Sequence, residues 1–262
     1  MPLLCEKRGP VAILTLSRPG KRNAWGSDYH QGLKELLPEL ERDTAVLCII
    51  LTGDEQGSAF CAGADMKDSE THNVDGMGEF LRALPITRRE SPFALLSGFS
   101  KPIIAAVNGY AVGIGAIITF CCDLIVASER AEWRLPQASL GIIPADAGAV
   151  RLSRFVGKGL AMRMAMGFPL KAGEAHQAGL AQWLVPHGEV LAKAMEVANH
   201  IASLPPLAVL MTKESLTQGI EIPLPWAALT DRYRFGALAM TEDKREGHEA
   251  WREGRKPRFK GR

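Results

Sequence analysis

Short apolar segments rich in β-branched residues recur along the first half of the chain. Four of them, residues 11–16, 46–53, 101–107 and 123–128, predict β-strands. The second and third are apolar at nearly every position, as expected for strands covered on both faces. Helical patterns lie between the strands, such as residues 27–41, with Ser27 as the candidate N-cap and Leu33, Leu36, Leu37 and Leu40 on one face. This alternation favours a layered α/β fold.

From about residue 157 the strand signals fade and helical patterns follow one another. They cover residues 159–167, 172–179, 190–204, 206–219 and 225–251, and Gly, Pro or polar residues separate them. We therefore predict two domains, an α/β core over residues 1–195 and a C-terminal helical region over residues 196–262.

Residues 102–122 contain no charged side chain over 21 positions, which is long enough for a membrane-spanning helix. Asn108 and Gly109, and then Gly113 and Gly115, interrupt this segment. It is therefore predicted to be a buried strand, a glycine-rich turn and a buried helix, with no membrane contact. The first ten residues carry charges and a Pro before any apolar run of signal-peptide length, so export is not indicated.

Composition narrows the class of protein further. The chain has 262 residues, 47% hydrophobic and 23% charged, with a formal net charge of +2. Wholesale disorder and a cationic nucleic-acid binder are both disfavoured, so no nucleic-acid partner is expected. The five cysteines form no CxxC pair, which indicates reduced thiols in the cytoplasm and no metal site. The last twelve residues carry a net charge of +5, and this tail is either solvated or a contact for phosphate.

Two glycine-rich segments, residues 57–67 and 108–116, each follow a predicted buried strand and lead toward a helix. Such a junction leaves backbone N–H groups unpaired at the positive end of the helix dipole, where they suit an oxyanion or a polarised carbonyl oxygen. Tight packing of loops on a sheet would give a similar composition. Phosphate-loop, GxSxG and HExxH motifs are absent, and GIGAII lacks the third glycine of the dinucleotide fingerprint.

Three segments together carry a family resemblance. In order and spacing, AFCAGADMK (59–67), KPIIAAVNGYAVGIG (101–115) and CDLIVASERAEWRLPQASLGIIPADAG (122–148) resemble the enoyl-CoA hydratase/isomerase, or crotonase, superfamily. The resemblance spans nearly the whole chain. It implies a crotonase-like spiral of ββα units with a C-terminal helical trimerisation region, assembled as a homotrimer or a dimer of trimers. It also implies an acyl-CoA thioester as the ligand, with coenzyme A as part of the substrate and no separate cofactor.

The resemblance also assigns residues to an acyl-CoA site. The family's oxyanion hole falls on the backbone N–H groups of Ala64 and Ile114, and Ile114 adds bulk where a Gly is usual. The coenzyme A channel falls on Arg22, Ala24, Ala62, Asp65, Met66 and Lys67, with Trp251 and the basic tail at the nucleotide end, as part of a neighbouring subunit. Lys67 could equally be an ordinary surface charge, and Asp65 could cap a following helix.

Two departures from the family pattern affect the chemistry. The two glutamates of the standard hydratases fall on Ile117 and Gln137, and neither side chain titrates. Each positioned acid–base group contributes ~10²–10⁴ in rate, so ordinary hydration should be very slow. Asp146 lies in a PDAG-like loop with one extra Ala and is the candidate single acid/base, with Gln137 orienting substrate or water. The alternative role of Asp146 is to cap a helix that begins near Ala147.

The predicted function is therefore an acyl-CoA enzyme that stabilises a thioester enolate, as an isomerase, a hydrolase or a C–C bond enzyme. An enoyl-CoA hydratase with atypical acids and a noncatalytic acyl-CoA binder are the alternatives. Arg134 could pair with a carboxylated acyl group or with a protein acid. His72 is either near the acyl pocket or a solvated loop histidine, and Trp133 belongs to the core or to an interface.

Overall fold

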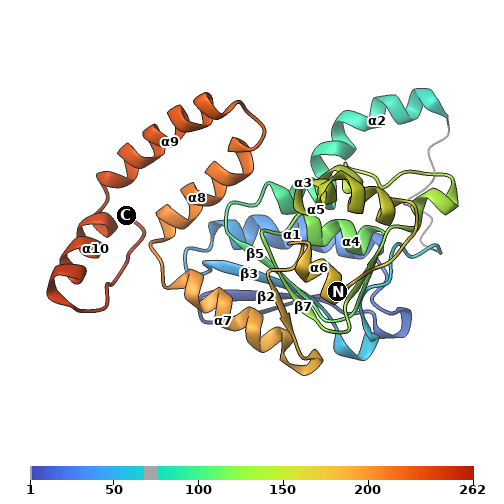
Figure 1. Ribbon diagram of the computed structural model, residues 1–262, viewed down its shortest axis with the longest axis horizontal. Helices are drawn as coiled ribbons and strands as arrows, with labels where there is room; N and C mark the ends of the chain where they lie inside the picture. Colours follow the sequence, from blue (N-terminus) through green and yellow to red (C-terminus); the bar gives the residue numbers. More distant parts are fainter. Residues whose placement is uncertain (1, 68–75) are drawn as a thin grey trace.

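Two sheets form the centre of the computed structural model, which describes residues 2–67 and 76–262 (Figure 1). The large sheet has the order β1 (Leu3–Arg8), β2 (Val11–Leu16), β3 (Cys48–Gly53), β5 (Ile103–Val107), β7 (Leu124–Ser128) and β10 (Trp183–Val185). The small sheet has the order β4 (Ala59–Cys61), β6 (Tyr110–Val112), β8 (Glu132–Arg134) and β9 (Leu170–Lys171). All pairings are parallel except β1 with β2 and β8 with β9.

The chain visits the two sheets in turn. Strands β3, β5 and β7 are neighbours in the large sheet, and β4, β6 and β8, which follow them along the chain, are neighbours in the small sheet. One or two helices follow each such pair of strands. They are α2 (Met77–Glu90) and α3 (Pro92–Ser97) after β4, α4 (Ile114–Phe120) after β6, and α5 (Gly148–Ala165) after β8. The prediction of a spiral of ββα units is thereby confirmed.

Helices cover both faces of the large sheet (Figure 1). On one face, Ile13, Ile50, Ile104 and Val126 pack against α7 (Val190–Ala202). The other face joins α1 (Ser27–Arg42), α3 and α4 in the larger apolar core. Residues 102–122 form β5, the short strand β6 and α4, so they fold as a strand, a turn region and a buried helix. No described helix is long and apolar enough to cross a membrane.

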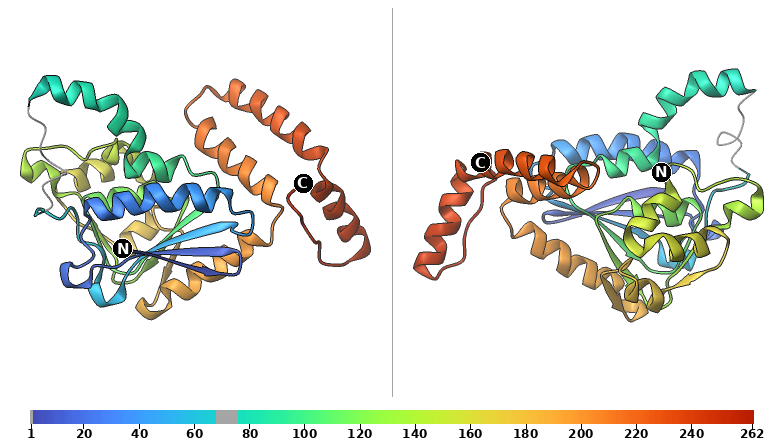
Figure 2. Two further views of the ribbon diagram at one scale, coloured as in Figure 1. Left: turned by 180° about the vertical axis from the view of Figure 1, so that it is seen from behind. Right: turned by 45° about the horizontal axis from the view of Figure 1, so that its top comes forward.

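The C-terminal helices α8 (Pro206–Gly219), α9 (Leu224–Ala239) and α10 (Glu242–Glu253) extend away from the sheets (Figure 2). The predicted boundary between residues 195 and 196 falls inside α7, which packs on the sheet, so the projecting part begins with α8. The single helix predicted over residues 225–251 is wrong. The chain breaks at Thr241, whose hydroxyl accepts the N–H of Lys244 at 3.2 Å and starts a new helix.

Further boundaries differ in detail from the sequence prediction. The N-cap of α1 is Gly26, and Ser27 is the first helical residue, so the prediction of Ser27 as N-cap is wrong. The helix predicted over 172–179 is α6 (Ala172–Gln177). The described residues also form the 3₁₀ turns η1 (Pro19–Lys21), η2 (Glu55–Gly57), η4 (Pro136–Leu140) and η5 (His187–Glu189).

The basic tail folds back along α10. Arg255 pairs with Glu246 at 2.6 Å, and the backbone N–H groups of Lys260 and Gly261 donate to the buried carboxylate of Asp243 at 2.6 and 2.8 Å. Arg262 Nε donates to Glu242 at 3.1 Å. Acidic side chains of α10 therefore engage part of the positive charge of the tail.

Candidate active site

The two glycine-rich junctions lie side by side at one edge of the small sheet. Strands β4 and β6 are parallel neighbours, with Cys61 in register with Ala111. The segments that follow these two strands therefore leave the small sheet at the same end. A Cβ built on Gly63 would lie 3.5 Å from the carbonyl oxygen of Val112. The predicted segments around Ala64 and Ile114 are therefore brought together.

Each junction offers an unpaired backbone N–H at the predicted donor position, Ala64 in the first and Ile114 in the second. The N–H of Trp25 donates to Gly63 O at 2.8 Å, and the N–H of Asp65 donates to Trp25 O at 2.7 Å, so the N–H of Ala64 takes no part in this pairing. Ile114 is the first residue of α4, where an N–H has no intrahelical acceptor. Neither N–H donates to an acceptor within residues 2–67 and 76–262. Both remain available to a ligand oxygen.

The loop of residues 18–26 lies along the first junction. The N–H of Ala62 donates to Arg22 O at 3.1 Å. The carboxylate of Asp65 is 9% exposed, accepts from Lys21 Nζ at 2.5 Å and lies 3.4 Å from Arg18 Nη1. The hydrogen bond from Lys21, together with that from the N–H of Lys67, holds the pKa of Asp65 below its usual range. The structure thus places Asp65 in an ion-pair network.

Most residues predicted for the coenzyme A channel are neighbours in the structure. Arg22, Met66 and Lys67 are exposed, and Ala24 and Ala62 are partly buried beside them. Trp251, which is 83% exposed, lies instead on α10 in the projecting helical part (Figure 1). One copy of the chain therefore does not bring Trp251 to the other channel residues.

The two positions that carry glutamates in standard hydratases differ in their surroundings. Ile117 is 1% exposed and belongs to the core, where a Cβ built on Gly148 would lie 2.7 Å from its Cδ1. Gln137 lies in η4 with its Nε2 3.5 Å from the place of a Cβ on Gly113. Its Oε1 is buried and has no hydrogen-bond partner in the described part of the chain. The amide of Gln137 therefore borders the second junction.

Asp146 lies in the loop that leads into α5. Asp146 and Ala147 both adopt left-handed backbone conformations, with φ of 49° and 60°. Helix α5 begins at Gly148 with Ala147 as its N-cap and no side-chain cap, so the helix-capping alternative for Asp146 is wrong. Instead its exposed carboxylate accepts a 3.3 Å hydrogen bond from Ser91 Oγ. Contact between Gly148 and Ile117 brings this loop against α4.

A buried asparagine missed in the sequence supports the first junction. Asn23 is fully buried, with φ of 56°. Its Nδ2 donates to Asp54 O at 2.9 Å and to Ala59 O at 2.8 Å, while its Oδ1 accepts the N–H of Arg18 at 3.1 Å. Asn is the side chain best suited to a left-handed position that also needs hydrogen bonds. The sequence Arg22-Asn23-Ala24 is the signal that could have identified this asparagine.

The contacts of Arg134 and Trp133 decide between the alternatives that the sequence left open for them. Arg134 pairs with a protein acid, since its Nε lies 2.5 Å from Glu132 Oε1. Its guanidinium carbon lies over the ring of Tyr110, 5.6 Å from the ring centroid. Trp133 is fully buried, and its Nε1 donates to Thr119 Oγ1 at 3.0 Å, so it belongs to the core. His72 lies outside the described residues.

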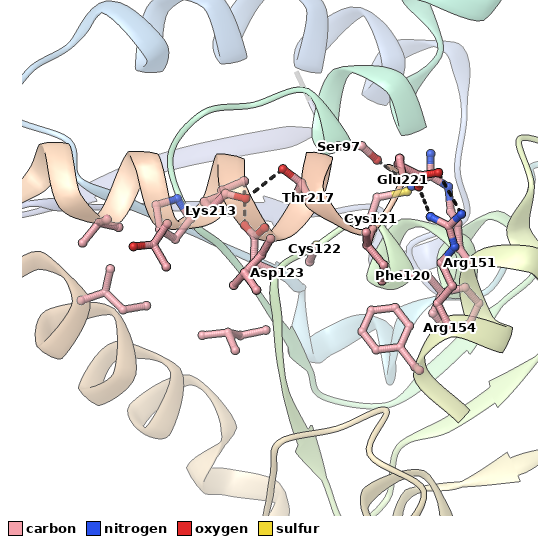
Figure 3. Close-up of a pocket in the computed structure, with 18 of the residues that line it drawn as sticks. Ser97, Phe120, Cys121, Cys122, Asp123, Arg151, Arg154, Lys213, Thr217 and Glu221 are labelled. Atoms are coloured by element: carbon pink, nitrogen blue, oxygen red, sulfur yellow. Dashed lines mark hydrogen bonds and ion pairs between the residues drawn. The ribbon is translucent and has the colours of Figure 1, made fainter. Parts of the chain in front are cut away.

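A separate cavity of about 860 Å³ lies between the end of α4, helix α5 and helix α8 (Figure 3). Most of its lining is apolar, with the Asp123–Lys213 pair at one place and Arg151, Arg154 and Glu221 at another. None of the residues predicted for the acyl-CoA site lines it. The cavity is therefore distinct from the two junctions.

Comparison with known proteins identifies the family. The family model for enoyl-CoA hydratase/isomerase matches residues 6–262. The 2,3-dehydroadipyl-CoA hydratase of Escherichia coli is 38% identical over 99% of both chains. The short-chain-enoyl-CoA hydratase of Clostridium acetobutylicum is 36% identical over 97% of this chain and 95% of that protein. The crystal structure of enoyl-CoA hydratase from Bacillus anthracis superposes with a TM-score of 0.91 at 30% identity, covering both chains completely.

The chain therefore belongs to the enoyl-CoA hydratase/isomerase family. It is an enzyme of the class that acts on acyl-CoA thioesters, and the resemblance read from the sequence is confirmed.

Proposed function

We propose that this enzyme forms an enolate from an acyl-CoA thioester with Asp146 as its single acid/base. The observation that carries the proposal is the burial of Ile117 in the core, where the standard hydratases are expected to place a glutamate. Since Gln137 has an amide at the second such position, Asp146 supplies the titrating group on the loop packed against α4.

The proposed steps follow from the two junctions. The thioester carbonyl oxygen accepts the N–H groups of Ala64 and Ile114. The carboxylate of Asp146 removes a proton from the α or γ carbon, and the electron pair moves to the carbonyl oxygen as an enolate. Fixed donors stabilise this developing charge, each by ~10²–10³ in rate. Return of the proton to the other carbon of a 2- or 3-enoyl thioester moves the double bond without loss or gain of atoms. The amide of Gln137 orients the acyl group or a water molecule.

Binding of the coenzyme A part belongs to the same proposal. The thioester lies along Arg22, Ala24, Ala62, Asp65, Met66 and Lys67, with coenzyme A entering as part of the substrate. Because Trp251 lies far along the projecting helices, its contact with the nucleotide end requires a neighbouring subunit of a trimer or a dimer of trimers (Figure 1).

A second candidate, hydration of a 2-enoyl-CoA, is favoured by the names of the relatives, which are hydratases. In this case Gln137 would hold the water and Asp146 would serve as the acid or base.

The test is to incubate the protein with crotonyl-CoA, 3-enoyl-CoAs and longer, cyclic and aromatic acyl-CoAs, and to follow product mass. Isomerisation, hydrolysis or cleavage that is lost in Asp146→Asn is expected. Fast hydration of crotonyl-CoA that is lost in Asp146→Asn would favour the second candidate. Fast hydration that survives Asp146→Asn would overturn both roles of Asp146. Tight binding without turnover of any thioester would leave the protein a noncatalytic binder.

A further inference from the structure

The backbone of the Asp146 loop is held in an unfavourable conformation by specific contacts. Asp146 and Ala147 are consecutive non-glycine residues with positive φ. Such residues persist only where the surrounding structure fixes them, and they concentrate at functional sites. The conformation of Asp146 therefore needs a partner that holds it.

Arg151 makes two hydrogen bonds to this loop, one from its backbone and one from its side chain, and a third from its side chain to helix α3. Its backbone N–H donates to Ala147 O at 2.7 Å, and its Nε donates to Asp146 O at 3.1 Å. Its Nη1 donates to Ser97 Oγ at 2.9 Å, and the two side chains are drawn together in Figure 3. The partly buried guanidinium thus joins the carbonyl of Asp146 to the last residue of α3.

The carboxylate of Asp146 is tied to the other end of the same helix. Ser91 is the N-cap of α3, and its Oγ accepts the N–H of Ala94 at 3.1 Å while donating to Asp146 Oδ1 at 3.3 Å. Helix α3 is therefore a short rigid element that holds the backbone of Asp146 through Arg151 and its side chain through Ser91.

We propose that Arg151 is a positioning residue for Asp146, so that the guanidinium fixes where the carboxylate meets the substrate. This inference rests on the proposed function, because it requires Asp146 to carry the proton. A displacement of about 1 Å at a reacting group costs up to ~10²-fold in rate, so the clamp acts on turnover more than on binding.

Arg154 provides a matched control. It lies three residues after Arg151 on α5, lines the same cavity and pairs with Glu221 (Figure 3). Among the described residues, no hydrogen bond or ion pair joins Arg154 to Asp146 or Ser97. Arg151→Gln and Arg154→Gln each remove one guanidinium from the same helix. Only Arg151→Gln removes the hydrogen bond from a guanidinium to the carbonyl of Asp146.

The experiment is a double-mutant cycle on the preferred thioester, with thermal unfolding of each variant. Arg151→Gln is expected to lower kcat by ~10–100-fold with KM changed less than about twofold, and Arg154→Gln to change kcat less than about twofold. In an Asp146→Asn background, Arg151→Gln is expected to cause no further loss, because it acts through the missing carboxylate.

Three outcomes would overturn the inference. Additive losses from Arg151→Gln and Asp146→Asn, or equal losses from the two arginine variants, would show a general structural role while leaving the proposed function intact. Full activity of Asp146→Asn would overturn the proposed function itself, and the positioning role with it.

Discussion

The carbonyl oxygen of Cys61 lies 2.6 Å from the place that a Cβ on Gly115 would occupy, and the Cβ of Cys61 lies 2.7 Å from it. Strand β4 and the first turn of α4 are therefore in direct backbone contact. This contact fixes the separation of the two donors, since Ala64 follows Cys61 by three residues and Ile114 precedes Gly115 by one. Burial raises the pKa of the Cys61 thiol to about 12, so this side chain packs as a neutral group.

Adding a single methyl group at Gly115 should therefore shift the candidate active site, because it would meet the backbone of Cys61. Gly115→Ala is expected to push α4 away from β4 and to lower kcat/KM at least about tenfold, because the N–H of Ile114, which we propose as an oxyanion donor, is displaced. The measurement is steady-state turnover of the preferred thioester. Gly159→Ala in α5 is the matched control, because a Cβ there meets no atom within 4 Å. Equal activity of the two variants would contradict the role of the contact.

The ion pair between Lys213 and Asp123 anchors α8 to the core. Lys213 Nζ donates to Asp123 Oδ2 and to Lys101 O at 2.7 and 2.8 Å, and its side chain is 9% exposed. Burial raises the pKa of Asp123, which Lys213 opposes. Lys213→Met leaves the partly buried carboxylate of Asp123 with the N–H of Ile103 at 2.7 Å but without a cation. It is expected to lower the free energy of unfolding by about 2–3 kcal/mol, measured by urea denaturation.

The exposed pair Lys34–Glu90, at 2.6 Å, is the control for this prediction. Lys34→Met should change stability by less than about 1 kcal/mol. If Lys213→Met cost no more than Lys34→Met, the anchoring of α8 by this pair would be disproved.

The basic tail should loosen in acid. The hydrogen bonds from Arg255 and from the N–H of Arg258 lower the pKa of Glu246 from 4.5 to about 2. A carboxylate with a lowered pKa stabilises the folded tail fully above about pH 4.5, and this contribution is lost as the pH falls toward 2. Amide hydrogen exchange of Arg258 should therefore lose protection over this range. In Glu246→Gln, the amide of Arg258 should show weak protection that does not vary with pH. If protection of this amide in the wild type did not vary with pH either, the link between Glu246 and the folded tail would be refuted.

Strands and junctions were predictable because their signals are local. Runs of β-branched residues marked β2, β3, β5 and β7, and glycines after two of these strands marked the two junctions. The family resemblance then assigned the donors to Ala64 and Ile114. The break at Thr241 was missed because helical periodicity continues on both sides of it, and only the hydroxyl of Thr241 ends one helix and starts the next.

Contacts between distant segments were not predictable. Asp65 meets Arg18 and Lys21 because the 18–26 loop lies along residues 62–65, a pairing more than forty positions apart in the sequence. The alternative role of Asp146, helix capping, is likewise wrong, because Ala147 is the N-cap of α5 and the carboxylate of Asp146 instead accepts a hydrogen bond from Ser91, the N-cap of α3.

The most direct test of the single-aspartate chemistry is exchange of the substrate's α or γ protons with D₂O, followed by mass spectrometry of the thioester. The wild type should incorporate deuterium, and Asp146→Asn should slow incorporation by ~10²–10⁴-fold while still binding the thioester. Incorporation at the wild-type rate in Asp146→Asn would show that another group moves the proton.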